Sequence, residues 1–267
     1  MNNNNFIILG NDLKMKECKN HLERLGYTAV NVSEDCLDQI RNYRNIILPL
    51  PTETEGKITG TDITTANLSD VVSDKQNIFY GNLNNNPFGD NGVCYYNDNE
   101  FVEYNAVLTA QGVMKIILDN VQMLIKDVRI AVLGFGKCGK AICKLLSQNE
   151  NNPDVFTRDS RSKIDALSSG YGHKNILEIN DVIYEYDIVI NTIPFNIIST
   201  QAIKTLTDEN IYIEIASKPY GFDVVSVDLS AFKYINASSL PGRFTPISAG
   251  RNIAKTIVRM IEEGEYG

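Results

Sequence analysis

Hydrophobic residues fall into two patterns that alternate along the chain. Short, nearly continuous apolar runs are typical of buried strands, and apolar residues spaced three or four positions apart are typical of amphipathic helices. In the N-terminal part, the first pattern predicts strands at residues 6–10, 28–32, 45–50 and 78–80. The second predicts helices at residues 12–25 and near residues 34–43, and the Asn- and Gly-rich residues 81–91 are predicted to form a loop.

The same alternation returns in the second half. Strands are predicted at residues 128–133, 153–157, 187–191, 211–215 and 233–236. A helix follows the first of them at residues 140–146, and an amphipathic helix at residues 246–263 closes the chain. Between the halves, a helical pattern covers residues 99–125, with a break expected near Asn105.

This order predicts an α/β fold with two Rossmann-like, doubly wound domains, joined by a long helix and with a cleft between them. Residues 1–105 are expected to form a flavodoxin- or Rossmann-like substrate domain, completed by the C-terminal helix at residues 246–267. Residues 106–245, which include the linking helix, are expected to form the NAD(P)-binding domain.

Composition favours a cytoplasmic enzyme. The chain has 267 residues, of which 43% are hydrophobic, and no apolar run approaches the length of about 20 residues that a membrane span requires. The five cysteines are scattered and include no Cys-x-x-Cys pair, so no disulfide framework or metal site is predicted. The net charge of −8 argues against nucleic acid as a partner.

A glycine motif lies between an apolar strand and a helix. Gly134, Gly136 and Gly139 have the Gly-x-Gly-x-x-Gly spacing, and this context is the one that indicates dinucleotide binding. The first glycine permits a tight turn, the second lets the backbone approach a pyrophosphate, and the third lets helix and strand pack closely. The predicted pyrophosphate loop comprises Gly134, Phe135, Gly136, Lys137, Cys138 and Gly139. The alternative is a glycine-rich turn without a ligand.

The end of the next strand indicates which dinucleotide is bound. An acidic residue at this position usually binds the ribose of NAD, and an Arg accommodates the 2′-phosphate of NADP. Here Thr157 and Arg158 form the tip, with Arg161 close behind and Asp159 as the opposing charge. We therefore predict NADP, with NAD less favoured, and the alternative is a solvated basic turn.

Two later strands end in polar residues. One ends in Asn191-Thr-Ile-Pro194, and the other continues into Ala216-Ser-Lys-Pro219. Ligands of doubly wound sheets bind beyond the carboxyl ends of the strands. We therefore predict cofactor contacts at Thr192, Ile193, Pro194 and Ala216. Ser217 and Lys218 are expected to face the reacting centre.

These segments, in this order, resemble the A subunits of dipicolinate synthase, which are relatives of the two-domain 2-hydroxy-acid dehydrogenases. The resemblance covers essentially the whole chain and is carried by six segments. They are residues 48–51 (Leu-Pro-Leu-Pro), 109–112 (Thr-Ala-Gln-Gly), 134–139, 191–194 with 215–217, and 240–250 (Leu-Pro-Gly-Arg-Phe-Thr-Pro-Ile-Ser-Ala-Gly). The chain departs from the family at Gln111, where a Glu is usual, at Tyr220, where a Gly is usual, and at Ser248, where a Lys is usual.

The resemblance implies oxidation in a branch of the diaminopimelate (lysine) pathway during sporulation. The cyclic product of pyruvate and aspartate semialdehyde would be dehydrated and dehydrogenated to dipicolinate, with NADP as hydride acceptor. The flavoprotein-like B subunit of dipicolinate synthase would accompany the chain, and a homo-oligomer is expected.

Simple 2-hydroxy-acid dehydrogenases need a His–carboxylate pair. The chain has only His21, in the first helix, and His173, which is expected in a Gly-rich surface turn.

A dicarboxylate substrate needs basic or hydrogen-bonding groups. The candidates for substrate contacts are Lys218, Arg243 in a Pro-Gly-Arg loop, Pro51, and Lys57, which follows the turn at Pro51. Amides near Gly242, and the last helix with Thr245 as its N-cap, are further candidates for a carboxylate. We assign catalysis to Lys218, Ser217 and Thr109 of the linking helix. Each of these residues has the plainer interpretation of a solvated charge or a helix cap.

Two other classes of function stay open. One is another NADP-dependent oxidoreductase, resembling shikimate or 2-hydroxy-acid dehydrogenases, since a shared fold hosts several chemistries. The other is a non-catalytic protein that senses nucleotides for a partner, which the departures at Gln111 and Tyr220 keep possible.

Overall fold

The computed structural model describes residues 5–34 and 37–264. It divides into two compact units. The first unit comprises the chain up to Asn105 and from Pro241 onward, and the second unit comprises Ala106–Leu240. Each unit contains one parallel sheet, which confirms the predicted α/β class.

The sheet of the first unit has five parallel strands in the order β2-β1-β3-β6-β7. The strands are β1 (Asn5–Leu9), β2 (Thr28–Val32), β3 (Asn45–Ile47), β6 (Asn77–Tyr80) and β7 (Gly92–Cys94). Counted along this sheet, the order is 2-1-3-4-5, the flavodoxin-like arrangement. A short hairpin of β4 (Glu53–Thr54) and β5 (Lys57–Ile58) follows β3.

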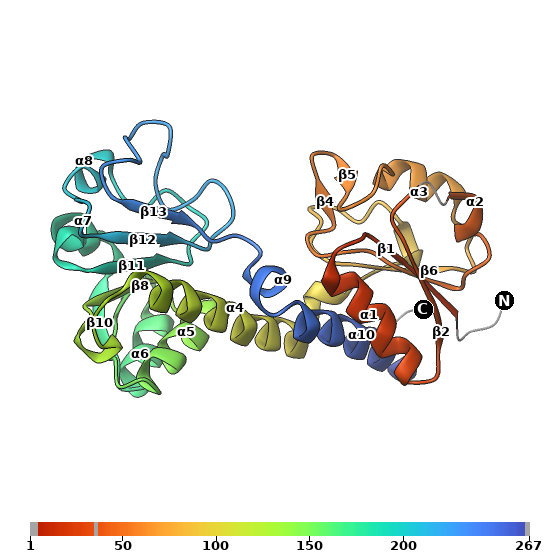
Figure 1. Ribbon diagram of the computed structural model, residues 1–267, viewed down its shortest axis with the longest axis horizontal. Coiled ribbons are helices and arrows are strands. Elements are labelled where there is room, and N and C mark those ends of the chain that lie inside the picture. The colour runs from red at the N-terminus through yellow and green to blue at the C-terminus, as the bar shows by residue number, and fades with distance from the viewer. Residues whose placement is uncertain (1–4, 35–36, 265–267) are drawn as a thin grey trace. The chain divides into compact units, whose positions relative to one another are not determined.

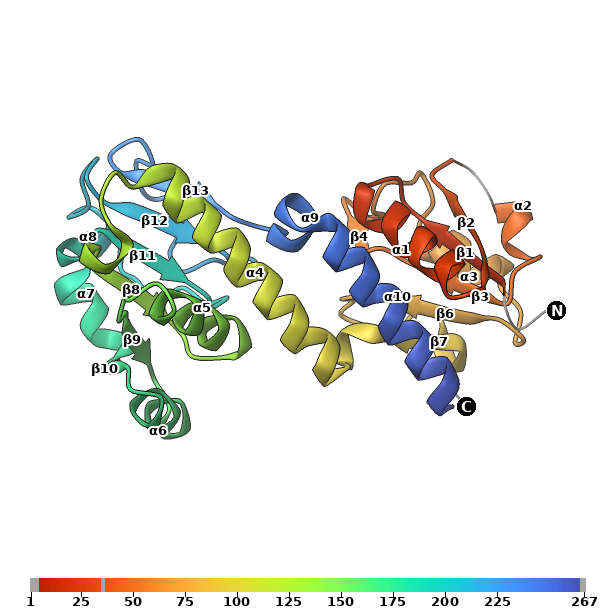
Figure 2. The same cartoon turned by 60° about the horizontal axis from the view of Figure 1, so that its bottom comes forward.

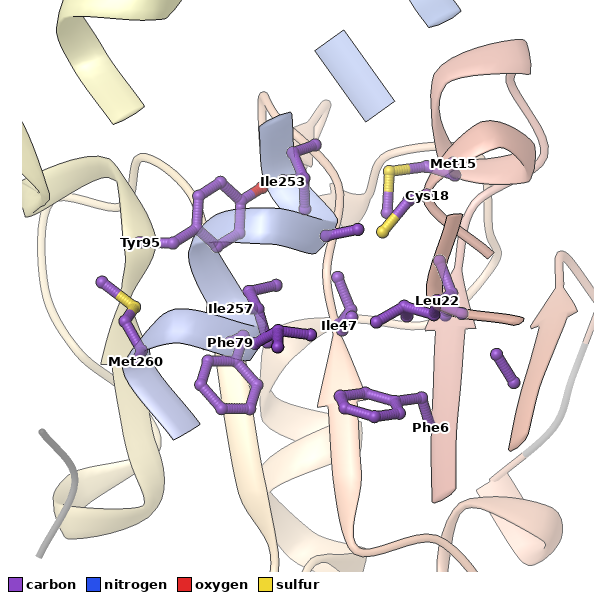
Figure 3. Packing of buried hydrophobic residues seen from close by; sticks show 14 of the residues in the cluster. Phe6, Met15, Cys18, Leu22, Ile47, Phe79, Tyr95, Ile253, Ile257 and Met260 are labelled. Carbon is purple, nitrogen blue, oxygen red and sulfur yellow. The ribbon is translucent and has the colours of Figure 1, made fainter. Parts of the chain in front are cut away.

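Helices cover both faces of this sheet. Side chains of β1 alternate between the faces, so that Phe6 and Ile8 pack with α1 (Leu13–Arg24) and α10 (Pro246–Glu263). Ile7 and Leu9 pack on the opposite face with α2 (Leu37–Ile40) and α3 (Thr65–Val71). Figure 3 shows the first of these cores, in which α1 and α10 residues meet Phe6, Ile47 and Phe79 of the strands.

Helices α1 and α10 lie side by side (Figures 1 and 2). Their close approach depends on Gly250, where a Cβ atom would lie 2.2 Å from the backbone oxygen of Lys14 and 2.9 Å from the nitrogen of Cys18. The C-terminal helix is thereby built into the core of the first unit, although it lies far from α1 in the sequence.

The sheet of the second unit has six parallel strands in the order β10-β9-β8-β11-β12-β13 (Figure 1). The strands are β8 (Ile130–Leu133), β9 (Asp154–Thr157), β10 (Gly172–Asn175), β11 (Ile188–Asn191), β12 (Ile211–Glu214) and β13 (Lys233–Asn236). This is the 3-2-1-4-5-6 order of dinucleotide-binding domains. The helices between its strands are α5 (Lys137–Ser147), α6 (Ser160–Ser168), α7 (Ile179–Val182) and α8 (Thr200–Ile203).

Several predictions about elements were wrong in detail. The linking helix α4 (Asn99–Asn120) continues through Asn105 without a break and ends at Asn120, five residues before the predicted end. His173 is not in a turn, because it lies in the edge strand β10. Of the helix predicted near residues 34–43, residues 35–36 lie outside the described residues and Leu37–Ile40 form the single turn α2. Strand β3 ends at Ile47.

Candidate active site

The glycine loop of the second unit connects β8 to α5. Gly134 has φ +94°, and a Cβ atom there would lie 2.4 Å from Oγ1 of Thr192. A Cβ atom at Gly139 would lie 2.2 Å from the carbonyl oxygen of Gly134. Both glycines are therefore required by the fold itself, because any side chain would separate the helix from the strand end.

Gly136 differs from these two glycines. It is the N-cap of α5, and a Cβ atom placed on it would have no atom within 4 Å. As glycine, it leaves the helix N-terminus without a capping side chain, where backbone N–H groups and the helix dipole favour an anion. The space beside Gly136 fits the approach of a pyrophosphate.

The linking helix contacts this loop through Thr109. Its side chain is 8% exposed and is hydrogen-bonded to Cys138 in the first turn of α5. Burial raises the pKa of the Cys138 thiol, and the hydrogen bond with Thr109 acts in the opposite direction. Phe135 is buried and packs edge-on against Tyr171, with ring centroids 5.7 Å apart. Lys137 is exposed at the start of α5.

The end of β9 presents the residues predicted to select the cofactor. Thr157 is buried, and its Oγ1 lies 2.9 Å from Nε2 of His173. Arg158 and Arg161 are exposed, and neither forms an ion pair with another described residue. Asp159 is the N-cap of α6 and accepts a hydrogen bond from the Ser162 amide at 2.8 Å. Hydrogen bonds from Ser162 lower the pKa of Asp159, so its carboxylate is engaged in capping.

The ends of β11 and β12 are connected by a buried carboxylate that the sequence analysis missed. Glu214 is fully buried, and its oxygens accept hydrogen bonds from Asn191 Nδ2 (2.8 and 3.1 Å), the Ala216 amide (3.0 Å) and the Gly221 amide (2.8 Å). Beside it, Oγ1 of Thr192 donates to the Leu133 carbonyl at 2.7 Å. Glu214 therefore fixes the starts of both loops that follow these strands.

Burial raises the pKa of Glu214 to about 6, and the hydrogen bonds from Gly221, Asn191 and Ala216 act in the opposite direction. The group is thus ionised near neutral pH, in the state that three N–H donors favour. Nothing in the sequence indicated that Glu214 holds these loops, because the hydrogen-bond donors Asn191 and Gly221 lie outside its own strand.

The loop that Glu214 fixes carries the predicted catalytic residues. Ser217 and Lys218 are exposed, and Lys218 forms no ion pair with any other described residue. Ala216 is buried, and Ile193 and Pro194 lie in the neighbouring loop after β11, half-buried and exposed respectively. The Ile197 and Ile198 amides of that loop donate to the Gly221 carbonyl at 2.9 and 3.0 Å, so the two loops form one framework.

The first unit contains the other predicted substrate residues. Lys57 is exposed in the β4–β5 hairpin and is paired with Asp62 at 2.7 Å. Pro51 is half-buried. The Pro-Gly-Arg segment is not a loop, because Gly242 and Arg243 lie in the short helix α9 (Leu240–Phe244). The Arg243 guanidinium stacks on the ring of Phe244, 5.3 Å from its centroid.

Thr245 occupies the N-cap position of α10 but does not cap it. Its hydroxyl donates instead to the Pro241 carbonyl at 3.2 Å. The expected hydroxyl cap was therefore wrong. In the described part of the chain no cluster of His, Cys, Asp and Glu has the arrangement of a metal site.

Comparisons with known proteins relate these features to a family. Residues 129–218 match the family described as "NADP oxidoreductase coenzyme F420-dependent". The A subunit of dipicolinate synthase from Bacillus subtilis (strain 168) is 25% identical over 171 residues, which cover 64% of this chain and 58% of the relative. The chain is a homologue of the dipicolinate synthase A subunits.

Solved structures show which fold the chain has. The dipicolinate synthase A subunit from Bacillus halodurans has a TM-score of 0.83 at 20% identity, over 97% of this chain and 98% of that one. D-2-hydroxyisocaproate dehydrogenase has a TM-score of 0.56 at 11% identity, with 97% of each chain covered. The homologue therefore has the fold of two-domain dehydrogenases, and its second unit contains an NAD(P)-binding, oxidoreductase-like domain.

The backbone at Tyr220 has an uncommon conformation. Tyr220, a position where the resemblance led us to expect glycine, lies in the left-handed region with φ 67°. A non-glycine residue in this region costs about 1 kcal/mol or more. The Tyr220 hydroxyl lies 3.4 Å from Asn236 Nδ2. Tyr220 thus adopts a conformation that suits glycine. Gln111 is exposed on α4, and Ser248 is half-buried in α10.

No described helix is both long enough and apolar enough to span a bilayer.

Proposed function

We propose that this chain is the A subunit of a dipicolinate synthase and oxidises a cyclic dihydrodipicolinate-type precursor to dipicolinate with NADP. The observation that carries the proposal is the 25% identity to the Bacillus subtilis A subunit over 171 residues. The aligned part spans only 58% of that relative, so its activity, substrate and partner apply to this chain as a proposal. A cytoplasmic location and a role in sporulation belong to the same proposal.

The second unit supplies the cofactor site in this proposal. The α5 N-terminus beside Gly136 would hold the pyrophosphate, and Arg158 with Arg161 would bind the 2′-phosphate, since Asp159 is engaged in capping. Thr192 and its neighbours Ile193 and Pro194 would line the nicotinamide ribose. NADP, when bound there, accepts a hydride.

The reaction balances without a further oxidant. The dihydropyridine ring loses one hydride to NADP and one proton to solvent, which gives the aromatic dicarboxylate and NADPH. A hydroxylated precursor loses a water as well. Aromatisation is favourable, so the chain's main contribution is to position the ring. Lys218 is proposed to bind a carboxylate, with Ser217 and Thr109 as hydrogen-bond donors, and Lys57, Pro51, Gly242, Arg243 and Thr245 remain further candidates for substrate contacts.

The flavoprotein-like B subunit of dipicolinate synthase is the proposed partner, and self-association is proposed as well. Both follow only from the relationship to the A subunits.

The test is turnover with freshly generated cyclic precursor, in four reactions that contain or lack NADP and contain or lack the B subunit. The proposal predicts dipicolinate formation only where NADP is present. NADPH binding without turnover in any reaction would instead favour a nucleotide-sensing role.

A further inference from the structure

The first unit contains a buried lysine to which the preceding sections assign no function. Lys14 lies in the first turn of α1 and is 7% exposed. Its ammonium donates a hydrogen bond to the Leu50 carbonyl and lies 3.4 Å from Oδ2 of Asp12. An ammonium carries three N–H donors. Among the described residues only these two groups bind it, which leaves one donor unused.

Lys14 is located where this type of sheet binds ligands. In the order 2-1-3-4-5, the connections leave β1 and β3 toward opposite faces of the sheet, and ligands bind beyond the carboxyl ends of these two strands. Lys14 follows β1, and its partner Leu50 follows β3. The buried ammonium is therefore at the switch point of the sheet.

Helix α9 borders the same ammonium. A Cβ atom at Gly242 would lie 3.7 Å from Nζ of Lys14, so the glycine leaves the space beside the cation free of a side chain. Leu50, which precedes Pro51, and Gly242 thus approach the Lys14 ammonium from separate segments, and Gly242 is one of the residues predicted from sequence to contact substrate.

The charge balance at this place favours an added anion. Burial lowers the pKa of Lys14, which reflects the cost of holding a cation away from water. Asp12 offsets this cost only partly. One of its carboxylate oxygens caps α1 by accepting a hydrogen bond from the Met15 amide, and the Asp12 side chain is 46% exposed. A carboxylate beside Nζ would receive the unused donor and improve the solvation of the ammonium.

We propose that Lys14 is a carboxylate-binding residue at the switch point of the first unit, and that its ligand is one carboxylate of the pyridine dicarboxylate or its reduced precursor. The identity of the ligand rests on the proposed function, whereas the anion site rests on the geometry of this unit. The competing explanation is that Lys14 only supports the Leu50 carbonyl.

Calorimetric titration with pyridine-2,6-dicarboxylate tests the proposal. Lys14→Met removes the cation and keeps an apolar stem, so affinity should fall about tenfold or more, as expected for one charge-assisted hydrogen bond. NADPH binding, which belongs to the second unit, should be unchanged, and the loss of the hydrogen bond to the Leu50 carbonyl is measured separately as a change in thermal stability. Lys16→Met, on an exposed position of the same helix, is the matched control and should bind as wild type.

Two further measurements keep the outcome decisive. Lys14→Arg retains the charge and should retain most of the affinity, and NMR of the Lys14 side chain in the wild-type protein should respond to the dicarboxylate. Unchanged affinity in a less stable Lys14→Met variant would overturn the proposal in favour of the structural role. Absence of binding by malonate, phthalate and pyridine dicarboxylate alike would overturn it too. Lys14-dependent binding of a different dicarboxylate would support the anion site and refute the proposed function.

Discussion

Replacing Glu214 by Gln tests whether this buried carboxylate stabilises the loops that follow β11 and β12 in the second unit. The two carboxylate oxygens accept hydrogen bonds from Asn191, Ala216 and Gly221. Gln has nearly the same shape but replaces one acceptor oxygen with an NH₂ donor. That donor must face at least one N–H group, which leaves a buried donor unpaired at a cost of about 1–3 kcal/mol.

The raised pKa of Glu214 also predicts how the stability difference between the wild type and Glu214→Gln changes with pH. A pKa raised from 4.5 to about 6 corresponds to about 2 kcal/mol of differential stability. Because the folded pKa lies above the unfolded one, this contribution is fully present below pH 4.5 and is lost as pH rises through about 6. The wild-type advantage over Glu214→Gln should therefore shrink by about 2 kcal/mol between about pH 4.5 and about pH 7.5.

Urea unfolding followed by circular dichroism would measure this difference, and amide exchange at Gly221 would locate it in the second unit. Glu209→Gln, on an exposed position of the same unit, is the control for the loss of one negative charge and should show no such slope. A wild-type advantage that grows with rising pH would refute the reasoning, because it would mean that the three donors outweigh burial and hold the pKa low.

Three further predictions concern ligands. Gly136→Val should fold, because a Cβ atom there meets nothing within 4 Å, but it should lose the fluorescence enhancement of bound NADPH. Gly139→Ala, in contrast, should unfold, because its side chain would collide with the Gly134 carbonyl. Undiminished enhancement in folded Gly136→Val would refute the pyrophosphate site. Arg158→Ala should weaken NADPH binding by about 1.5–3 kcal/mol in titrations and leave NADH nearly unchanged, and equal losses would indicate a folding effect. Lys218→Met should keep NADPH affinity while turnover of the cyclic precursor falls about tenfold or more; wild-type kinetics would make Lys218 a solvated lysine.

The fold could be predicted because its strands are buried on both faces. Parallel strands such as β8 and β11 are continuous apolar runs, and their ends are marked by glycine or by polar residues. The edge strand β10 was missed because Gly172–Asn175 is polar, and its pairing depends on contacts such as that of His173 with Thr157 on β9. Such contacts leave no periodicity in the sequence.

The site was predictable only where the local sequence determines it. The loop from Gly134 to Gly139 has a fixed spacing, so its turn could be recognised directly. Glu214 and Lys14 were missed because their significance lies in burial by distant segments, at Gly221 in one case and at Leu50 and Gly242 in the other. A charged residue near a strand end or in a first helical turn is ordinarily solvated, so burial has to be observed.

The stoichiometry of turnover tests the proposed function most directly. Freshly generated cyclic precursor, NADP and the purified chain, with the B subunit added in a parallel reaction, would be followed by NADPH absorbance and by quantification of dipicolinate. We predict one NADPH formed per dipicolinate and little reaction with NAD. Dipicolinate formed at the same rate without NADP, or NADPH formed without dipicolinate, would contradict the assignment of this chain as the NADP-dependent oxidising component.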